Sequence, residues 1–305
     1  MKKCDIAVIL TCFNRKKLTV ASLGSVFQAC TLYNENCDRQ LSLSVFLTDD
    51  GCTDGTANAV LSEFPNEDIH IVQGTGSLYW AGGMRLAWKE ALKDRRKWDF
   101  YLLINDDTIL CDDAFVELFR THQYVVERHH KAGLYCGTCS NFEGTAFIFG
   151  GKKYRKGLFG KAITVVPDGT PLPCFMTCAN VLMVSSNVFE AVGMLDEYYT
   201  HTNADWAYGI EAGRHGFPVY VTGKVCGMCE NDHPTEIMEG KKIISMTLSE
   251  RKAFFAHPLR GTKDRLYFMW KYSKIRFFAL FFARKLNIYF PRIYYRLIPY
   301  RPSES

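Results

Sequence analysis

The chain has 305 residues, 48% of them apolar and 23% charged, with a formal net charge of +5. This composition is typical of a globular protein and excludes a disordered or collagen-like chain. The length predicts one large domain, or one domain with an appendage. The apolar run 277–283 near the C-terminus has seven residues, whereas a membrane-spanning helix needs roughly 20. The N-terminus shows no secretory signal, so we expect the protein to begin at Met1 and to be cytoplasmic.

Strands and helices alternate through the first third of the chain. A continuous apolar run over 4–12 is typical of a strand buried on both faces of a parallel sheet. Further strands are expected at 41–48, 69–73 and 100–104, with helices at 16–32, 55–63 and 83–95 between them. This alternation predicts an α/β fold with a mostly parallel central sheet flanked by helices. After about residue 112 the pattern loosens into a helix and then strands with aromatic loops.

Polar and flexible residues follow four of the predicted strands. Thr11, Phe13 and Asn14 lie at the end of the first strand, Asp50 at the end of the second, and Asp106 and Asp107 at the end of the fourth, while Gly82 and Gly83 follow the third. In an open α/β sheet, ligands bind beyond the carboxyl ends of the strands. The sequence therefore predicts a nucleotide-type site at this edge.

Asp106 and Asp107 are the strongest metal-ligand candidates. Carboxylates are hard oxygen ligands, and Mg²⁺ or Mn²⁺ typically takes one or two of them together with substrate phosphates. The competing interpretation is an acidic helix start, but Asp112 and Asp113 fit that role better because they immediately precede the next helix. Asp50 lies in an acidic turn, where it can accept a hydrogen bond from a pyrimidine N3–H or serve ordinary turn chemistry.

Gly82 and Gly83 are expected just before a helix. Glycine permits close backbone approach to a ligand and a helix start favours phosphate, while plain capping is the alternative. The chain has no Walker-type G-x-x-x-x-G-K-[ST] motif, and no G-x-G-x-x-G follows the first strand. An ATPase and a dinucleotide dehydrogenase are therefore disfavoured.

Asp205 lies between aromatic and polar residues near a predicted helix start. Its carboxylate can act as a general base or cap the helix, and the sequence alone does not separate the two. The neighbouring Trp206 can stack on the face of a sugar ring.

Twelve cysteines include two C-x-x-C pairs, Cys136/Cys139 and Cys226/Cys229. Two such pairs can hold zinc, but here they are far apart in the chain and flanked by apolar residues. We expect reduced cysteines that mostly pack as small core residues.

The C-terminal segment 263–301 holds ten basic residues, one acid, Asp264, and 13 aromatic residues. Basic residues interleaved with aromatics suit an anionic membrane surface. Packing on the body alone is the second interpretation, and nucleic acid is the least favoured partner. One aromatic stripe is expected to face the body, with the basic residues outward: the stripe is Phe277, Phe278, Phe281 and Phe282, and the basic residues are Lys271, Lys274, Arg276, Arg284 and Lys285.

Taken in order, these motifs resemble glycosyltransferase family 2, the inverting nucleotide-sugar-dependent enzymes with the GT-A fold. The resemblance runs through ILTCFNR, TDDGCTDGT, LYWAGGMRLAW and LLINDDTIL, and continues over 180–217. It covers about residues 4–230. The LYWAGGM segment, VCGMCEND and the basic aromatic tail resemble the rhamnosyltransferase-like branch.

The resemblance implies a GT-A domain over 1–230 and a largely helical extension over 231–305. It places Thr11, Phe13 and Asp50 at the nucleoside, with Asn14, Gly82, Gly83 and Asp106 also on the donor side. It makes Asp107, with Asp106, the ligand of Mg²⁺ or Mn²⁺, and Asp205 the catalytic base. Trp206 and Trp80 are expected on the acceptor side. Three positions depart from the family pattern: Arg85, Ala207 and Glu211.

The implied reaction is inverting transfer of a sugar from a dTDP-, UDP- or GDP-sugar to a hydroxyl of a glycan or lipid-linked acceptor. The setting would be cell-surface polysaccharide synthesis, with the enzyme peripheral on the inner face of the cytoplasmic membrane. The alternative is a non-catalytic protein that binds nucleotide sugar, or a membrane-associated adaptor.

Overall fold

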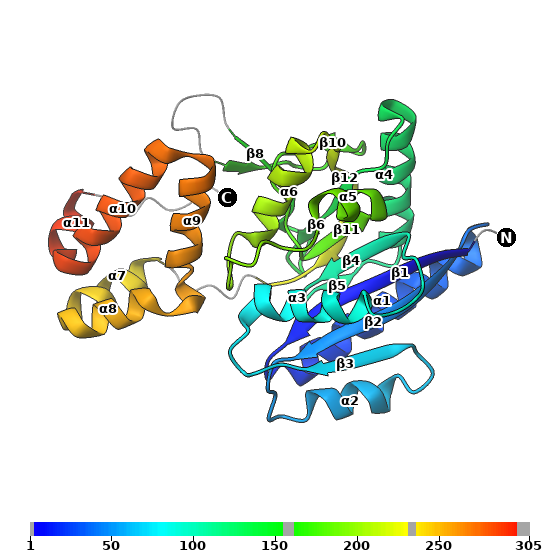
Figure 1. Ribbon diagram of the computed structural model, residues 1–305, viewed down its shortest axis with the longest axis horizontal. Coiled ribbons are helices and arrows are strands. Elements are labelled where there is room, and N and C mark those ends of the chain that lie inside the picture. Colours follow the sequence, from blue (N-terminus) through cyan, green and yellow to red (C-terminus); the bar gives the residue numbers. More distant parts are fainter. Residues whose placement is uncertain (1–2, 155–161, 231–235, 298–305) are drawn as a thin grey trace.

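The computed structural model describes residues 3–154, 162–230 and 236–297. A ten-stranded sheet with the order β10-β12-β6-β11-β4-β1-β2-β3 forms its centre, with β5 paired to β12 and β7 to β6 (Figure 1). Its strands are β1 Lys3–Cys12, β2 Gln40–Asp49, β3 Ile69–Gln73, β4 Phe100–Ile104, β5 Ile109–Leu110, β6 Leu134–Ser140, β7 Phe147–Phe149, β10 Leu172–Pro173, β11 Val181–Ser185 and β12 Val219–Met228. A separate two-stranded sheet pairs β8 Lys152–Tyr154 with β9 Ala162–Thr164.

Helices cover both faces of the large sheet. They are α1 Lys16–Asn36, α2 Thr56–Glu63, α3 Tyr79–Ala91, α4 Ala114–His129, α5 Ser186–Val192 and α6 Ala204–Arg214. The C-terminal helices are α7 Glu236–Ser245, α8 Leu248–Ala256, α9 Thr262–Tyr272, α10 Lys274–Tyr289 and α11 Pro291–Leu297, with a 3-10 turn at Pro258–Arg260.

The strands β3, β2, β1 and β4 run parallel, so their carboxyl ends lie at one edge. Cys12 pairs with Asp49 at that edge. The next strand, β11, runs antiparallel to β4, with Val181 opposite Ile104. The chain therefore enters β11 at the same edge where it leaves β4. The predicted α/β class, with a mostly parallel central sheet flanked by helices, is confirmed.

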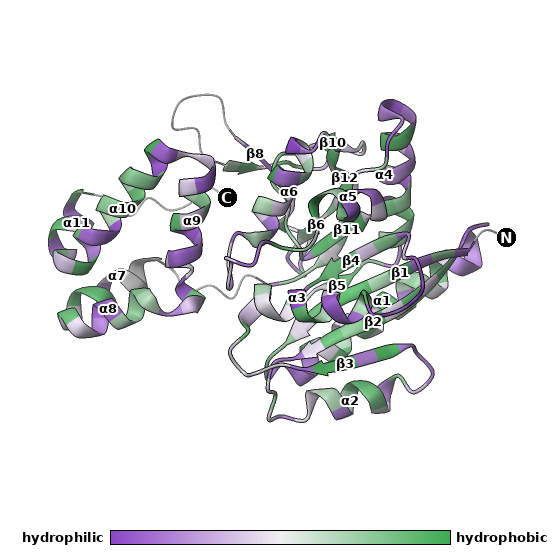
Figure 2. Cartoon of the chain, in the orientation of Figure 1, coloured by the Kyte–Doolittle hydropathy of each residue, from purple (hydrophilic) through white to green (hydrophobic). Residues whose placement is uncertain are grey.

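Two apolar layers sandwich the sheet, as the run over 4–12 predicts. Ile6, Val8 and Leu10 belong to the cluster under α1, α2 and α4, whereas Ala7 and Ile9 belong to the cluster under α3, α5 and α6. Successive strand residues point to opposite faces, so an uninterrupted apolar strand is needed where both faces are covered. Figure 2 shows the central strands coloured hydrophobic along much of their length.

The predicted start of the third helix is wrong. We expected it at residue 83, but α3 begins at Tyr79. Gly82 and Gly83 therefore lie inside the helix, beyond the first amides that are available to a phosphate. Gly83 has a packing role, because a Cβ there would lie 2.7 Å from Cβ of Thr11. Its absence lets α3 lie directly on β1.

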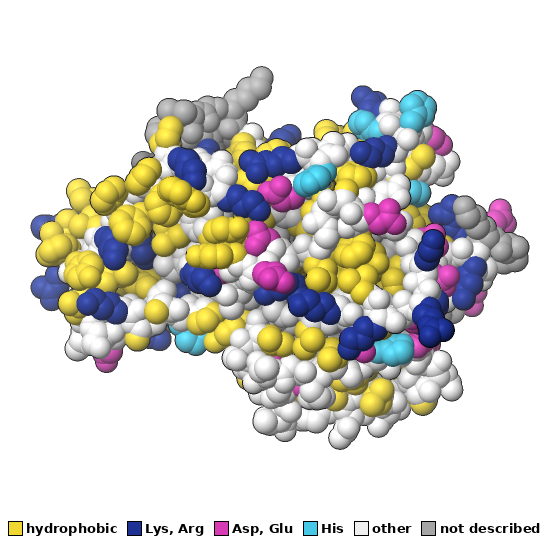
Figure 3. Space-filling model, viewed as in Figure 1, with side chains coloured by type: hydrophobic (Ala, Val, Ile, Leu, Met, Phe, Trp, Pro, Cys, Tyr) yellow, Lys and Arg dark blue, Asp and Glu magenta, His cyan; other side chains and the backbone are white. Residues whose placement is uncertain are grey.

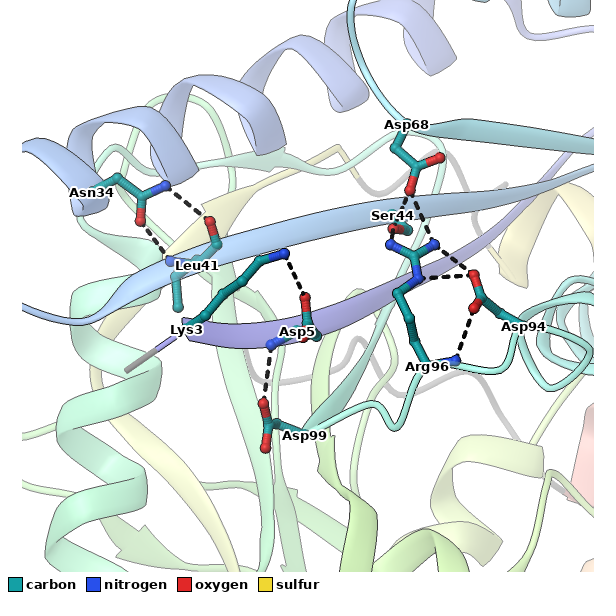
Figure 4. Close-up of polar contacts among 9 residues, drawn as sticks. All are labelled: Lys3, Asp5, Asn34, Leu41, Ser44, Asp68, Asp94, Arg96 and Asp99. Carbon is teal, nitrogen blue, oxygen red and sulfur yellow. Dashed lines mark hydrogen bonds and ion pairs between the residues drawn. The ribbon is translucent and has the colours of Figure 1, made fainter. Parts of the chain in front are cut away.

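Charged contacts brace the far end of the sheet. Arg96 donates hydrogen bonds to Asp94, Asp68 and Ser44, which joins the α3–β4 connection to β2 and to the start of β3 (Figure 4). The Arg96 contact lowers the pKa of Asp94 to about 2. In the same view, Asp99 accepts from the Asp5 amide of β1 at 3.0 Å.

The C-terminal helices pack on the body through α9, whose Phe268 is buried beneath α6. The division at residue 230 stays a prediction. Within the described ranges, none of the helices combines the length and the apolar character that crossing a bilayer requires. Tyr300 and Arg301 of the predicted basic segment lie outside the described residues.

Two expectations about that segment are wrong. Phe278 and Phe282 do not face the body but are 52% and 65% exposed, because they lie on a different face of α10 from the half-buried Phe277 and Phe281. The half-buried Arg276 and Arg284 turn inward over the rings of Tyr154 and Phe255. Lys271 is also drawn inward, by Asp196 and Glu211.

Candidate active site

The loops after β1 and β2 are joined by Asn14. Its backbone is left-handed, with φ of 53°, and its side-chain oxygen accepts from the Thr53 amide at 2.7 Å. Asp54 accepts from the Lys16 amide at 2.9 Å, which adds a second link. The predicted nucleoside residue Phe13 is exposed next to Asn14. Strand-end loops that sequence analysis placed together are therefore joined.

Asp50 organises the loop that precedes α3. Its buried carboxylate accepts three backbone amides, from Gly76 at 2.8 Å, Leu78 at 2.9 Å and Tyr79 at 3.1 Å. A carboxylate at a helix start satisfies otherwise unpaired N–H groups and suits the helix dipole. Asp50 thus sets the start of α3, while its contact with a nucleoside stays a prediction.

Arg15 bridges the two acids that follow β4. It donates to Oδ1 of Asp106 at 3.0 Å and to Oδ2 of Asp107 at 2.8 Å. Burial raises the pKa of Asp106 to about 7, the guanidinium of Arg15 opposes that rise, and the neighbouring Asp107 adds to it. The two carboxylates are thus held side by side by one cation. Sequence analysis assigned no role to Arg15. The sequence feature that pointed to a role was its cationic side chain just beyond the first strand.

These acids fit a metal that is shared with a substrate. Oδ1 of Asp107 is buried and has no hydrogen-bond partner, so one carboxylate oxygen is left for a cation. Among the residues that the structure describes, no three His, Cys, Asp or Glu side chains form a group suited to a metal. A cation here would therefore take the remainder of its ligands from a bound molecule, which is how Mg²⁺ is commonly held.

The start of α3 links both sides of this edge. The indole of Trp80 donates to Oδ1 of Asn105 at 2.8 Å, next to the paired acids. The Ala81 amide donates to the carbonyl of Thr200 at 3.1 Å, in the loop that leads to Asp205. Trp80, predicted to contact an acceptor, is half-buried and in this structure positions Asn105.

Asp205 lies in the first turn of α6 and is partly buried. One carboxylate oxygen accepts the Trp206 amide at 2.9 Å, and the other accepts the Ala179 amide at 3.2 Å. Burial raises the pKa of this carboxyl to about 6, and the two amides oppose the rise. A group with this pKa is ionised at neutral pH and can still take up a proton, as a general base must.

The segment before β11 connects Asp205 to the acidic pair. Ala179, which binds the Asp205 carboxylate, is followed by Asn180. The buried Asn180 amide donates to the Thr108 hydroxyl at 3.2 Å, one residue after Asp107. Because β11 is antiparallel to β4, these two segments meet at the carboxyl edge. Acids about a hundred residues apart in the chain are thus brought to one edge of the sheet.

The three departures from the family pattern have structural explanations. Arg85 donates to the carbonyls of Asp196 and Tyr199, at 3.1 and 3.0 Å, and so braces the loop before α6. Ala207 is buried in the core under α6. Glu211 accepts from the Tyr272 hydroxyl at 2.6 Å, which joins α6 to α9.

Trp206, the other predicted acceptor residue, is half-buried. Its ring meets Phe268 of α9 edge-on at 6.1 Å. The ammonium of Lys152 lies 5.5 Å from the centre of the indole.

Asp264 is a positioning residue that sequence analysis missed. It is 1% exposed at the start of α9. Its carboxylate accepts the amides of three consecutive residues in the loop before Asp205: Thr200 at 3.2 Å, His201 at 2.7 Å and Thr202 at 2.9 Å. The signal was its isolation as the single acid in a basic segment.

The strand order and the polar edge define a GT-A-like α/β fold. No family model matches the chain, and no curated protein matches it. Solved structures that share the fold include S. aureus TarS residues 1–349, with a TM-score of 0.50 at 14% identity, covering 100% of this chain and 77% of that one. The same TarS fragment in complex with UDP-GlcNAc gives a TM-score of 0.52 at 14% identity with equal coverage. Against a longer TarS structure the TM-score is 0.50 at 15% identity, and this chain covers 46% of it. The similarity is one of fold.

Proposed function

We propose that this protein is an inverting glycosyltransferase that moves a sugar from a nucleoside diphosphate to a hydroxyl group. The observation that carries the proposal is the convergence of Asp106, Asp107 and Asp205 on one edge of a GT-A-like sheet. The family 2 assignment and the rhamnosyltransferase-like branch rest on the sequence motifs. The hexosyl nature of the donor sugar belongs to the same proposal.

Asp205 is the proposed base. Its raised pKa lets it accept a proton from the acceptor hydroxyl as the oxygen attacks the anomeric carbon. The bond from that carbon to the diphosphate breaks on the opposite side, so the anomeric centre inverts. The segment 179–180 links the proposed base to Thr108, the residue after Asp107, which supports this arrangement.

Asp107, with Asp106, would hold Mg²⁺ or Mn²⁺ together with the donor diphosphate. When bound, the cation would neutralise charge on the leaving diphosphate as a Lewis acid. Arg15 keeps the two carboxylates together and already supplies one positive charge at this place. Loss of transfer in chelator and its return on adding Mn²⁺ test this part of the proposal.

A nucleotide sugar is the proposed donor. Support comes from the TarS fragment, a structure of the same fold, which is in complex with UDP-GlcNAc. UDP-sugars are therefore tried first, followed by dTDP- and GDP-sugars. The proposed acceptor is a glycan or a lipid-linked glycan in cell-surface polysaccharide synthesis, at the inner face of the cytoplasmic membrane.

The first test compares Asp205→Asn and Asp107→Ala with the parent enzyme in a transfer assay. General-base catalysis contributes roughly 10²–10⁴-fold, so Asp205→Asn is expected to lose about that factor while still binding donor. Asp107→Ala is expected to lose both transfer and Mn²⁺ binding. Asp168→Asn, in an exposed turn where the carboxylate accepts from the amide and hydroxyl of Thr170, is the matched control. Full activity in either site variant would refute the mechanism.

A non-catalytic nucleotide-sugar-binding protein is the second candidate. It is favoured by the double ion pair of Arg15, which occupies oxygens of both proposed metal ligands. Donor binding in the presence of Mn²⁺ without any turnover across an acceptor panel would support it. Turnover that depends on Asp205 would exclude it.

A further inference from the structure

We propose that the exposed face of α10 and α11 binds the surface of an anionic lipid bilayer. This inference gives a surface and a lipid class to the membrane contact in the proposed function, and its test needs no transfer activity. In Figure 3, hydrophobic side chains and Lys or Arg side chains mingle over the end of the molecule that α10 and α11 form.

The apolar part of this face has helical spacing. On α10, Ile275, Phe278 and Phe282 recur at intervals of three and four residues and are 58%, 52% and 65% exposed. On α11, Ile293 and Leu297 are four residues apart and are also exposed. Large side chains in one stripe are expected to be buried by a partner, because a soluble surface rarely leaves a contiguous apolar patch uncovered.

An open apolar hollow lies on the same face. It has a volume of about 400 Å³. Its lining residues are Phe282, Ala283, Lys285, Leu286, Tyr289 and Phe290. A hollow of this lining offers acyl chains a place to insert between side chains.

The positive charge of these helices favours an anionic partner. Residues 271–297 contain seven Lys or Arg and no acid. Lys274 and Lys285 are exposed beside the apolar stripe, and the ammonium of Lys274 lies over the ring of Trp270. Cations at the rim of an apolar face match anionic headgroups, which attract each Lys or Arg near the surface. A second copy of this chain would bring cations against cations, which disfavours self-association through the same face.

The face is fixed relative to the active site. Lys271, in α9, pairs with Asp196 at 3.0 Å and with Glu211 of α6 at 3.3 Å. Asp264 of the same helix binds the loop before Asp205. Because α9 packs against α10, and α10 against α11, a bilayer on these two helices would be held at a defined position relative to the proposed base, which suits a lipid-linked acceptor.

Co-sedimentation of the full chain with vesicles of phosphatidylcholine, with and without phosphatidylglycerol, tests the proposal. Binding is expected only with phosphatidylglycerol and is expected to weaken as NaCl is raised. The double variant Phe278→Ser/Phe282→Ser should lower the vesicle partition coefficient about tenfold or more. Phe142→Ser, at an exposed phenylalanine in the turn after β6, is the matched control and should bind as the parent does.

A charge variant separates the attraction of Lys side chains to headgroups from the insertion of apolar side chains into the bilayer. Lys274→Gln/Lys285→Gln should lower binding to anionic vesicles about tenfold, whereas Arg95→Gln/Lys97→Gln, at exposed positions between α3 and β4, should not. Equal binding to both vesicle types, no binding, or binding unaffected by the Phe278/Phe282 change would overturn the proposal. So would a concentration-dependent dimer that the same change dissociates. Failure of vesicle binding with transfer intact would leave the proposed function standing.

Discussion

At the scale of single residues, the environment of Asp205 determines what this site can do. Two backbone amides hold its carboxylate in one orientation, and burial works against its charge. These effects oppose each other, and the net result is a pKa of about 6. The group can therefore take a proton and release it again within the physiological pH range.

The pH dependence of transfer follows from this value. A base must be unprotonated. With saturating Mn²⁺, which would keep Asp106 ionised, kcat/KM is therefore expected to fall tenfold for each pH unit below about 6 and to level off above it. Steady-state rates across pH 4.5–8 (roughly the span over which a carboxyl of this kind titrates) would measure this fall in kcat/KM. The residual activity of Asp205→Asn should not fall in this way. The same fall in that variant would assign the titration to another group.

At the scale of elements, the contact of α3 with β1 depends on Gly83 having no side chain. Thr11 lies where a Cβ at position 83 would be. The Thr48 hydroxyl also donates to the carbonyl of Gly83 at 2.8 Å. Helix and sheet thus approach each other closely at the edge where the proposed donor binds.

Gly83→Ala is therefore expected to destabilise the fold despite alanine's higher helix propensity. Overpacking of this kind typically costs about 1–3 kcal/mol. Gly213→Ala, in α6 with no atom near its would-be Cβ, should instead stabilise by about 0.4–1 kcal/mol. Urea denaturation midpoints measure both. A Gly83→Ala protein as stable as Gly213→Ala would mean that α3 can move away from β1 at no cost.

The same helix shows how far the sequence predicts the fold. The strands at 69–73 and 100–104 are confirmed to the residue, because apolar runs bounded by polar turns are local signals. The start of α3 was missed because Asp50, from another loop, supplies the acceptor for its first amides. No local capping residue marks that position.

The candidate site likewise has a part that the sequence predicts and a part that it does not. The acids after β4 follow from topology, since parallel strands deliver their carboxyl ends to one edge. The bridge made by Arg15 depends on a side-chain conformation, and the contact between Asp264 and residues 200–202 joins distant segments. The sequence marks Arg15 only as a cation beyond the first strand and Asp264 only as the single acid of a basic segment, so neither contact could be predicted from the chain alone.

At the scale of the whole molecule, the C-terminal helices complete the active-site edge. Asp264 satisfies three consecutive amides of the loop before Asp205, and Lys271 ties α9 to that loop and to α6. Hydrogen bonds to a charged group contribute about 1.5–3 kcal/mol each. The loop is therefore held from two sides, by α3 within the predicted GT-A domain and by α9 outside it.

Asp264→Ala should free this loop. Hydrogen exchange at the amides of Thr200, His201 and Thr202 is expected to rise by at least tenfold, with transfer lowered in parallel, because the loop would no longer hold Asp205 in place. Asp168→Ala, which removes the acceptor for the exposed Thr170 amide, should speed exchange only near that turn. Unchanged protection at 200–202 would show that the contacts of Arg85, Ala81 and Lys271 suffice to hold the loop.

This dependence on Asp264 has a consequence for biosynthesis. On the ribosome, the four parallel strands emerge first, while most of the chain is still untranslated. The loop before Asp205, the proposed base, stays without its Asp264 anchor until α9 has left the exit tunnel. Under the proposed function, a chain truncated before α9 would therefore carry the donor-side acids but lack the contact that holds residues 200–202.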